Sequence, residues 1–188
     1  MTARWAVEVA PQRNLDIRWK PISLLLKNEP EPGSDYHDPV MKTHRMLRVM
    51  ESVRAAEGEA PMKDLYFALG TAVHHDKQLD FDIGDLLSGL GLDPGHAAAA
   101  DDVGFDAAIE ASMDDGLGLT GDDVGTPIIA VKRSDGERVA YFGPVITARP
   151  EGDKALLLWD SLMAMMDIDG FWELKRTRTE GPQFGDRP

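Results

Sequence analysis

The sequence predicts an α/β fold in which a helical block interrupts a small sheet. Residues 15–20 alternate apolar and charged side chains, which indicates a strand, and the apolar spacing from residue 40 to about residue 100 is helical. Two short strand-like runs, "IIAVK" and "RVAYF", follow that block. The order is therefore helix, strand, helical block, strand, strand, helix, and the distant strands must share one sheet.

A short helix over residues 3–10 is expected to open the chain and to end at Pro11. Its apolar face carries Trp5, Ala6, Val9 and Ala10. The strand that follows has a period of two, typical of a strand with one buried face, and its apolar residues are Leu15, Ile17 and Trp19. Residues 27–38 are rich in Pro, Gly, Asn and Asp and predict a loop.

Several helices are predicted in the middle of the chain. Two apolar stripes have helical spacing: Met62, Leu65, Tyr66, Leu69 and Val73 in one, and Ile83, Leu86, Leu87 and Leu90 in the other. Residues 58–61 separate two of the helices, Asp82 is the expected N-cap of a third, and Asp93 and Pro94 are expected to start a fourth. A last helix is expected to end at Gly116 and Gly118. Its apolar side carries Phe105, Ile109, Ser112 and Met113.

The end of the chain predicts a β-hairpin followed by a helix. Residues 134–136, Ser-Asp-Gly, are typical of a tight turn between the two strand-like runs. The closing helix should bury one face, which carries Ala155, Trp159, Leu162 and Met166.

Composition excludes several classes of function. The net charge of −13 would repel nucleic acid and anionic membrane surfaces. The chain has no cysteine, which excludes disulfides, thiolate metal sites and a cysteine nucleophile within it. No export signal and no long apolar run is present, so we expect a cytoplasmic protein that does not enter membranes.

Pro127 stands where an apolar strand is about to begin, although proline cannot donate a strand hydrogen bond. One interpretation is a trans proline that starts an edge strand. The other is a cis Thr126-Pro127 bond, which would leave the backbone groups of Thr126 free to pair with an extended ligand.

The run "DVGTPIIAV", the hairpin ending in "YFGPV" and the segment "LLLWDSLM…FWELKRTRTEGPQF" together resemble the DsbA-like branch of the thioredoxin superfamily, in particular cytoplasmic members described as mycothiol-dependent reductases. The resemblance extends over nearly the whole chain. It implies a thioredoxin-like sheet with an all-helical insertion between its strands. It also implies that Pro127 is the family's cis-proline, with Val124, Gly125 and Thr126 as the substrate-facing loop.

In such proteins a Cys-Pro-x-x motif at the start of the first helix carries the chemistry, because the helix N-terminus lowers the thiol pKa. By the resemblance this motif and the first strand would precede Met1, so we expect no catalytic residue in this chain and an inactive chain on its own. Either the chain begins at an internal methionine of a longer protein or it is a cysteine-free relative.

The resemblance implies a thiol-disulfide oxidoreductase. Two alternatives are a glutathione-dependent isomerase of the 2-hydroxychromene-2-carboxylate type and a non-catalytic thiol- or peptide-binding module. We expect no bound cofactor. The expected partner is a small thiol or disulfide, with mycothiol or glutathione as the co-substrate. A homodimer is left open. The predicted division is a core of residues 1–35 and 119–188 with a helical lid of residues 36–118.

Two further residues are candidates for the same groove. Tyr36 lies in the Pro-rich loop, and His74 lies near the end of an insertion helix that overhangs the active site in the resembling family. A solvated or capping role is the simpler reading of His74. Neighbouring helical residues such as His74 and His75 point about 100° apart, and the other histidines are scattered, so no metal site is expected.

Overall fold

The computed structural model describes residues 1–187. The chain folds as two compact units. The first comprises Met1–Ile17 and Asp115–Gly185, and the second comprises Arg18–Asp114 together with Asp186 and Arg187. No helix within residues 1–187 is both long enough and apolar enough to cross a membrane.

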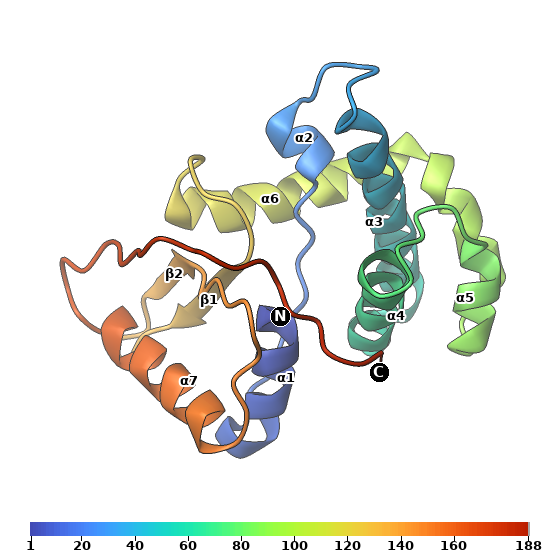
Figure 1. Cartoon of the computed structure of the whole chain (residues 1–188). Coiled ribbons are helices and arrows are strands. Elements are labelled where there is room, and N and C mark those ends of the chain that lie inside the picture. The colour runs from blue at the N-terminus through green and yellow to red at the C-terminus, as the bar shows by residue number, and fades with distance from the viewer. Residues whose placement is uncertain (188) are drawn as a thin grey trace. The chain divides into compact units, whose positions relative to one another are not determined.

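The first unit is built on an antiparallel hairpin, as predicted (Figure 1). In that hairpin Ile128 lies opposite Phe142 and Lys132 lies opposite Arg138. The turn uses Gly136 in the left-handed region, with φ of 88°, which glycine adopts without steric cost. The elements of this unit are α1 (Thr2–Arg13), β1 (Ile128–Lys132), β2 (Arg138–Phe142) and α7 (Asp153–Met166).

Two tryptophans form the centre of the first unit's core. Trp5 of α1 is fully buried, its ring centroid lies 5.7 Å from that of Trp159, and its indole N–H donates to the carbonyl of Ala155 at 2.9 Å. The predicted inner face of α7 is confirmed, because Ala155, Trp159, Leu162 and Met166 are all buried. Side chains from both strands pack against this cluster, among them Ile129, Val131, Val139 and Tyr141.

The prediction that Pro11 ends the first helix is wrong. The helix continues to Arg13, and Pro11 lies inside it. Proline removes one helical hydrogen bond, but its φ suits a helix. The helix ends instead at Asn14, a left-handed residue with φ of 51° whose N–H donates to the carbonyl of Ala10.

The strand predicted at Leu15–Trp19 does not form. Residues 15–20 have neither helix nor strand structure, although their burial alternates as expected, with Leu15, Ile17 and Trp19 half-buried and their charged neighbours exposed. A strand requires a hydrogen-bonded neighbour. Within the described residues the sheet consists of β1 and β2 alone.

The second unit is helical. Its elements are α2 (Leu24–Asn28), α3 (His37–Glu57), α4 (Met62–His74), α5 (Ile83–Gly89), the 3₁₀ helices η1 (Pro94–Asp101) and η2 (Val103–Phe105), and the first part of α6 (Asp106–Thr120). Two details differ from the prediction. Helix α2 reaches into the predicted loop, and α6 continues past Gly116 and Gly118, because a single glycine costs a helix only about 1 kcal/mol.

Helices α3, α4 and α5 bury most of the two predicted stripes in one core, but Tyr66 and Leu90 of those stripes are exposed. Met62, Leu65, Leu69 and Leu87 are buried in it together with side chains of α3. Asp82 caps α5 as predicted, since its carboxylate accepts from the N–H of Asp85 at 3.0 Å. The α/β, thioredoxin-like fold class that the sequence predicts is confirmed, but within the described residues both strands follow the helical block, which therefore does not interrupt the sheet. The predicted boundaries at residues 36 and 118 stay a prediction.

Candidate functional site

The loop before β1 carries four of the predicted site residues. The Thr126-Pro127 peptide bond is cis, as the resemblance implies. Val124, Gly125 and Pro127 are half-buried, and Thr126 is exposed. The four residues therefore form one continuous surface at the entrance to the hairpin.

The backbone N–H and C=O groups of this loop are available to a ligand. Within residues 1–187 the N–H and C=O groups of Val124, Gly125 and Thr126 form no hydrogen bond to other backbone groups outside helices and strands. The first bond of the hairpin follows at Pro127, whose carbonyl accepts from the N–H of Gly143 at 2.7 Å. An extended ligand can therefore pair with the loop in the manner of an added strand.

A second cis proline lies beside the first. The Gly143-Pro144 bond follows β2 and is also cis. Gly143 has φ of 103°, and a Cβ there would lie 3.1 Å from the N atom of Val145, so only glycine fits. The carbonyl of Pro144 accepts from the hydroxyl of Thr2 at 2.7 Å. Two hydrogen bonds thus tie the Thr126-Pro127 loop, through residues 143–144, to the start of α1.

The start of α1 favours negative charge. The first amide groups of a helix have no partner inside it, and the helix dipole is positive at this end. No acidic side chain lies in the first turn, and Arg4 donates to the carbonyl of Phe184 at 3.1 Å. This end of α1 is therefore suited to a negatively charged group such as a thiolate.

The other two predicted residues belong to the second unit. Tyr36 stands at the start of α3, and its exposed hydroxyl accepts from the side-chain amide of Asn28 at 2.8 Å. His74 is the last residue of α4 and is exposed. Their contact with a ligand stays a prediction.

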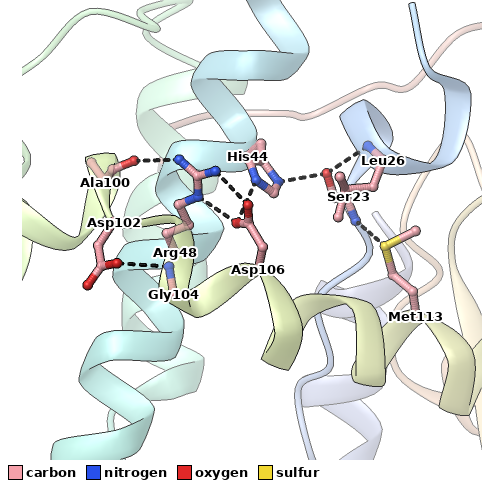
Figure 2. Close-up of polar contacts among 9 residues, drawn as sticks. All are labelled: Ser23, Leu26, His44, Arg48, Ala100, Asp102, Gly104, Asp106 and Met113. Atoms are coloured by element: carbon pink, nitrogen blue, oxygen red, sulfur yellow. Dashed lines mark hydrogen bonds and ion pairs between the residues drawn. The ribbon is translucent and has the colours of Figure 1, made fainter.

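A second polar constellation is buried in the helical unit, and Figure 2 shows it. His44 of α3 joins two elements: its Nδ1 lies 2.9 Å from the hydroxyl of Ser23, and its Nε2 lies 3.0 Å from a carboxylate oxygen of Asp106. Arg48, one turn further along α3, donates to both oxygens of Asp106 at 2.6 and 2.7 Å. The hydroxyl of Ser23 also caps α2 by accepting from the N–H of Leu26 at 3.2 Å.

The charges in this network are set by its surroundings. The hydrogen bond from Arg48 holds the pKa of Asp106 below its usual range, and burial lowers the pKa of His44. A neutral His44 accepts from Ser23 and donates to Asp106, so every partner is satisfied. Ser, His and Asp here resemble the order of a hydrolase triad, but Ser23 and His44 are each only 1% exposed, so no substrate reaches them. The network is structural.

Sequence reasoning missed this network and the second cis proline. Each left a weak signal. His44 and Arg48 have the i, i+4 spacing of one helix face, and "FGP" places a second proline next to a glycine at the end of a strand-like run. Nothing local connects Ser23 or Asp106 to them. Among the described residues, no three His, Cys, Asp or Glu side chains gather as a metal site would require.

Comparison with known families identifies the chain. The family model described as "Rv2466c-like: Mycothiol-dependent nitroreductase Rv2466c" matches residues 1–176. The chain belongs to this family.

The match corrects the expectation drawn from the resemblance. The chain is not a member of the DsbA-like family, and the predicted activity as a thiol-disulfide oxidoreductase is wrong. The two alternatives, a hydroxychromene carboxylate isomerase and a non-catalytic binding module, do not match either. What holds is the dependence of the family on a small thiol, mycothiol.

Proposed function

We propose that this protein takes part in the reduction of nitro compounds by mycothiol. The observation that carries the proposal is the unpaired backbone of residues 124–126 tied to the start of α1, in a chain whose family is described as mycothiol-dependent nitroreductases. The loop would bind the thiol in an extended conformation, and the start of α1 would stabilise its sulfur as a thiolate.

The reaction balances with two thiols for each two-electron step. The nitro nitrogen is reduced to nitroso, two thiols are oxidised to one disulfide, and one nitro oxygen leaves with both thiol protons as water. None of the 188 residues is cysteine, so on this chain the sulfur comes from the bound thiol. The residues of this chain would bind the thiol, orient it and favour its ionised form.

The start of α1 offers a second contribution. Reduction places negative charge on the nitro oxygens, and amide N–H groups at a helix N-terminus stabilise such charge. The absence of acidic side chains from the first turn of α1 leaves this field unopposed within that turn. The same end of the helix would therefore favour both the thiolate and the developing oxyanion.

The test is an assay of the purified chain with mycothiol and a nitroaromatic compound. The missing cysteine motif predicts an inactive chain, but the bound thiol can supply the sulfur instead. We therefore expect loss of the nitro absorbance that depends on mycothiol and yields one disulfide for each nitroso group formed. Nitro loss equal to the blank, or equal with and without the thiol, would contradict the proposal.

A variant of the loop tests whether the thiol binds there. Gly125 has room for a side chain, since the nearest atom to a Cβ there would be in Phe142 at 3.9 Å, so Gly125→Leu should fold while its side chain covers the loop. We expect its KM for mycothiol to rise about tenfold or more. Gly89→Leu is the control, because Gly89 lies in α5 of the other unit with no atom within 4 Å of its Cβ position. Equal KM values for the wild type and the Gly125 variant would place the thiol elsewhere.

A further inference from the structure

A cavity of about 470 Å³ lies beside α4 and α5 in the helical unit. Its apolar lining includes Phe67, Phe81 and Leu86, and its polar lining includes Asp76 and Gln78. Arg187, from the end of the chain, also lines it. None of these residues belongs to the mycothiol site proposed above.

One end of the cavity favours positive charge. Asp76 lies just beyond the C-terminal end of α4, and its N–H donates to the carbonyl of Thr71 at 3.1 Å. The helix dipole is negative at this end and adds to the charge of the carboxylate. Asp76 is at the surface, and its side chain is 28% exposed with Arg187 lying against it, so a ligand from solvent can reach the carboxylate once Arg187 moves away.

The planar guanidinium group of Arg187 pairs with the carboxylate of Asp76. The Nε and Nη2 atoms of Arg187 donate to the two oxygens of Asp76 at 2.7 and 3.0 Å. The side chain of Arg187 is 64% exposed, so few contacts hold it besides this bidentate pair. Exposed ion pairs contribute little stability, and Arg187 can therefore be displaced by a better ligand.

Aromatic rings stand next to the charged end. Phe67 is held in place by edge-on contacts with Trp19 and Tyr66, with ring centroids 5.9 and 5.4 Å apart. Phe81 supplies a second aromatic side chain to the lining. Aromatic faces attract cations and pack against flat rings, so the cavity combines an anion for a positive head with walls for an apolar body.

We propose that this cavity is a binding site for an organic cation, namely an amidinium or guanidinium group carried on an aromatic body, and that Arg187 occupies the same carboxylate in competition with it. The head would pair with both oxygens of Asp76, as Arg187 does. The body would lie against Phe67 and Phe81. This proposal does not depend on the proposed reduction of nitro compounds.

Benzamidine is the probe, because its amidinium reproduces the two parallel N–H groups of Arg187. We expect saturable binding in a calorimetric or NMR titration, tightened about two- to fivefold in Arg187→Ala, which removes an exposed ion pair as competitor. Asp76→Asn should weaken binding about tenfold or more, since it removes a charge-assisted bidentate contact.

Two controls keep the test specific. Benzoate has the same shape with the opposite charge and should not bind. Asp80→Asn changes a nearby exposed carboxylate, which pairs with Lys42 at 2.6 Å, and should leave benzamidine affinity unchanged. The proposal is overturned if benzamidine fails to saturate Arg187→Ala, if Asp76→Asn binds as tightly as the wild type with an unchanged circular dichroism spectrum, or if benzoate binds equally well.

Discussion

Removal of the Asp106 carboxylate tests the buried network of the helical unit. In Asp106→Ala three donors lose their acceptor: Nε and Nη2 of Arg48 and Nε2 of His44. The side chain of Arg48 is 11% exposed and that of His44 is 1% exposed, so water replaces the lost partner poorly. The carbonyl of Ala100, at 3.3 Å, is the acceptor that remains for Arg48.

The expected loss in the free energy of unfolding depends on how deeply the pair between Arg48 and Asp106 is buried. Breaking a fully buried ion pair from one side costs about 3–5 kcal/mol. Asp106 is 24% exposed, which allows some water to reach Arg48, so we expect the free energy of unfolding to fall by about 3 kcal/mol, near the low end of that range. Urea denaturation at pH 7, followed by far-ultraviolet circular dichroism, measures the change.

The pair between Arg13 and Asp160 is the control, because it has the same bidentate geometry but is more exposed. Arg13 donates to both oxygens of Asp160 at 2.7 and 2.6 Å, but the two side chains are 34% and 50% exposed. Asp160→Ala should therefore lower the free energy of unfolding much less than Asp106→Ala does. Asp101→Ala, which removes the exposed pair with Arg45 in the helical unit itself, should also have a small effect. Equal losses in Asp106→Ala and Asp160→Ala would refute the argument from burial.

Two further predictions concern stability. Burial lowers the pKa of His44, so the stability that a neutral His44 contributes is present above its ordinary pKa of about 6.5 and is lost as the pH falls through the lower value of the folded state. His44→Gln should flatten this pH dependence in denaturation curves between pH 7 and 5, and an unchanged slope would contradict it. Trp159→Ala should cost about 3–5 kcal/mol because Trp159 packs on Trp5 in the core, and Trp172→Ala, at a residue that is 85% exposed, should stay within about 0.5 kcal/mol; thermal unfolding of the two variants compares them directly.

The sequence predicted those elements whose signal is local. The hairpin follows from a turn between two β-prone runs, and α7 follows from a face whose four apolar residues are all buried. The prediction failed where the outcome depends on a distant partner. Residues 15–20 have the alternation of a strand and even its pattern of burial, yet alternation specifies only which side faces the core, and a strand also needs a neighbour to pair with.

The same distinction governs the candidate site. Pro127 at the start of an apolar strand left two interpretations open, and the family resemblance, not the local pattern, predicted the cis bond that the structure has. The contact between Thr2 and Pro144 joins residues far apart in the chain, so no local sequence pattern predicts it. Yet that contact links the loop to the positive end of α1, and this end is what favours a thiolate. The sequence therefore indicated the loop that we propose binds the thiol, while the link from this loop to the start of α1 follows from tertiary structure alone.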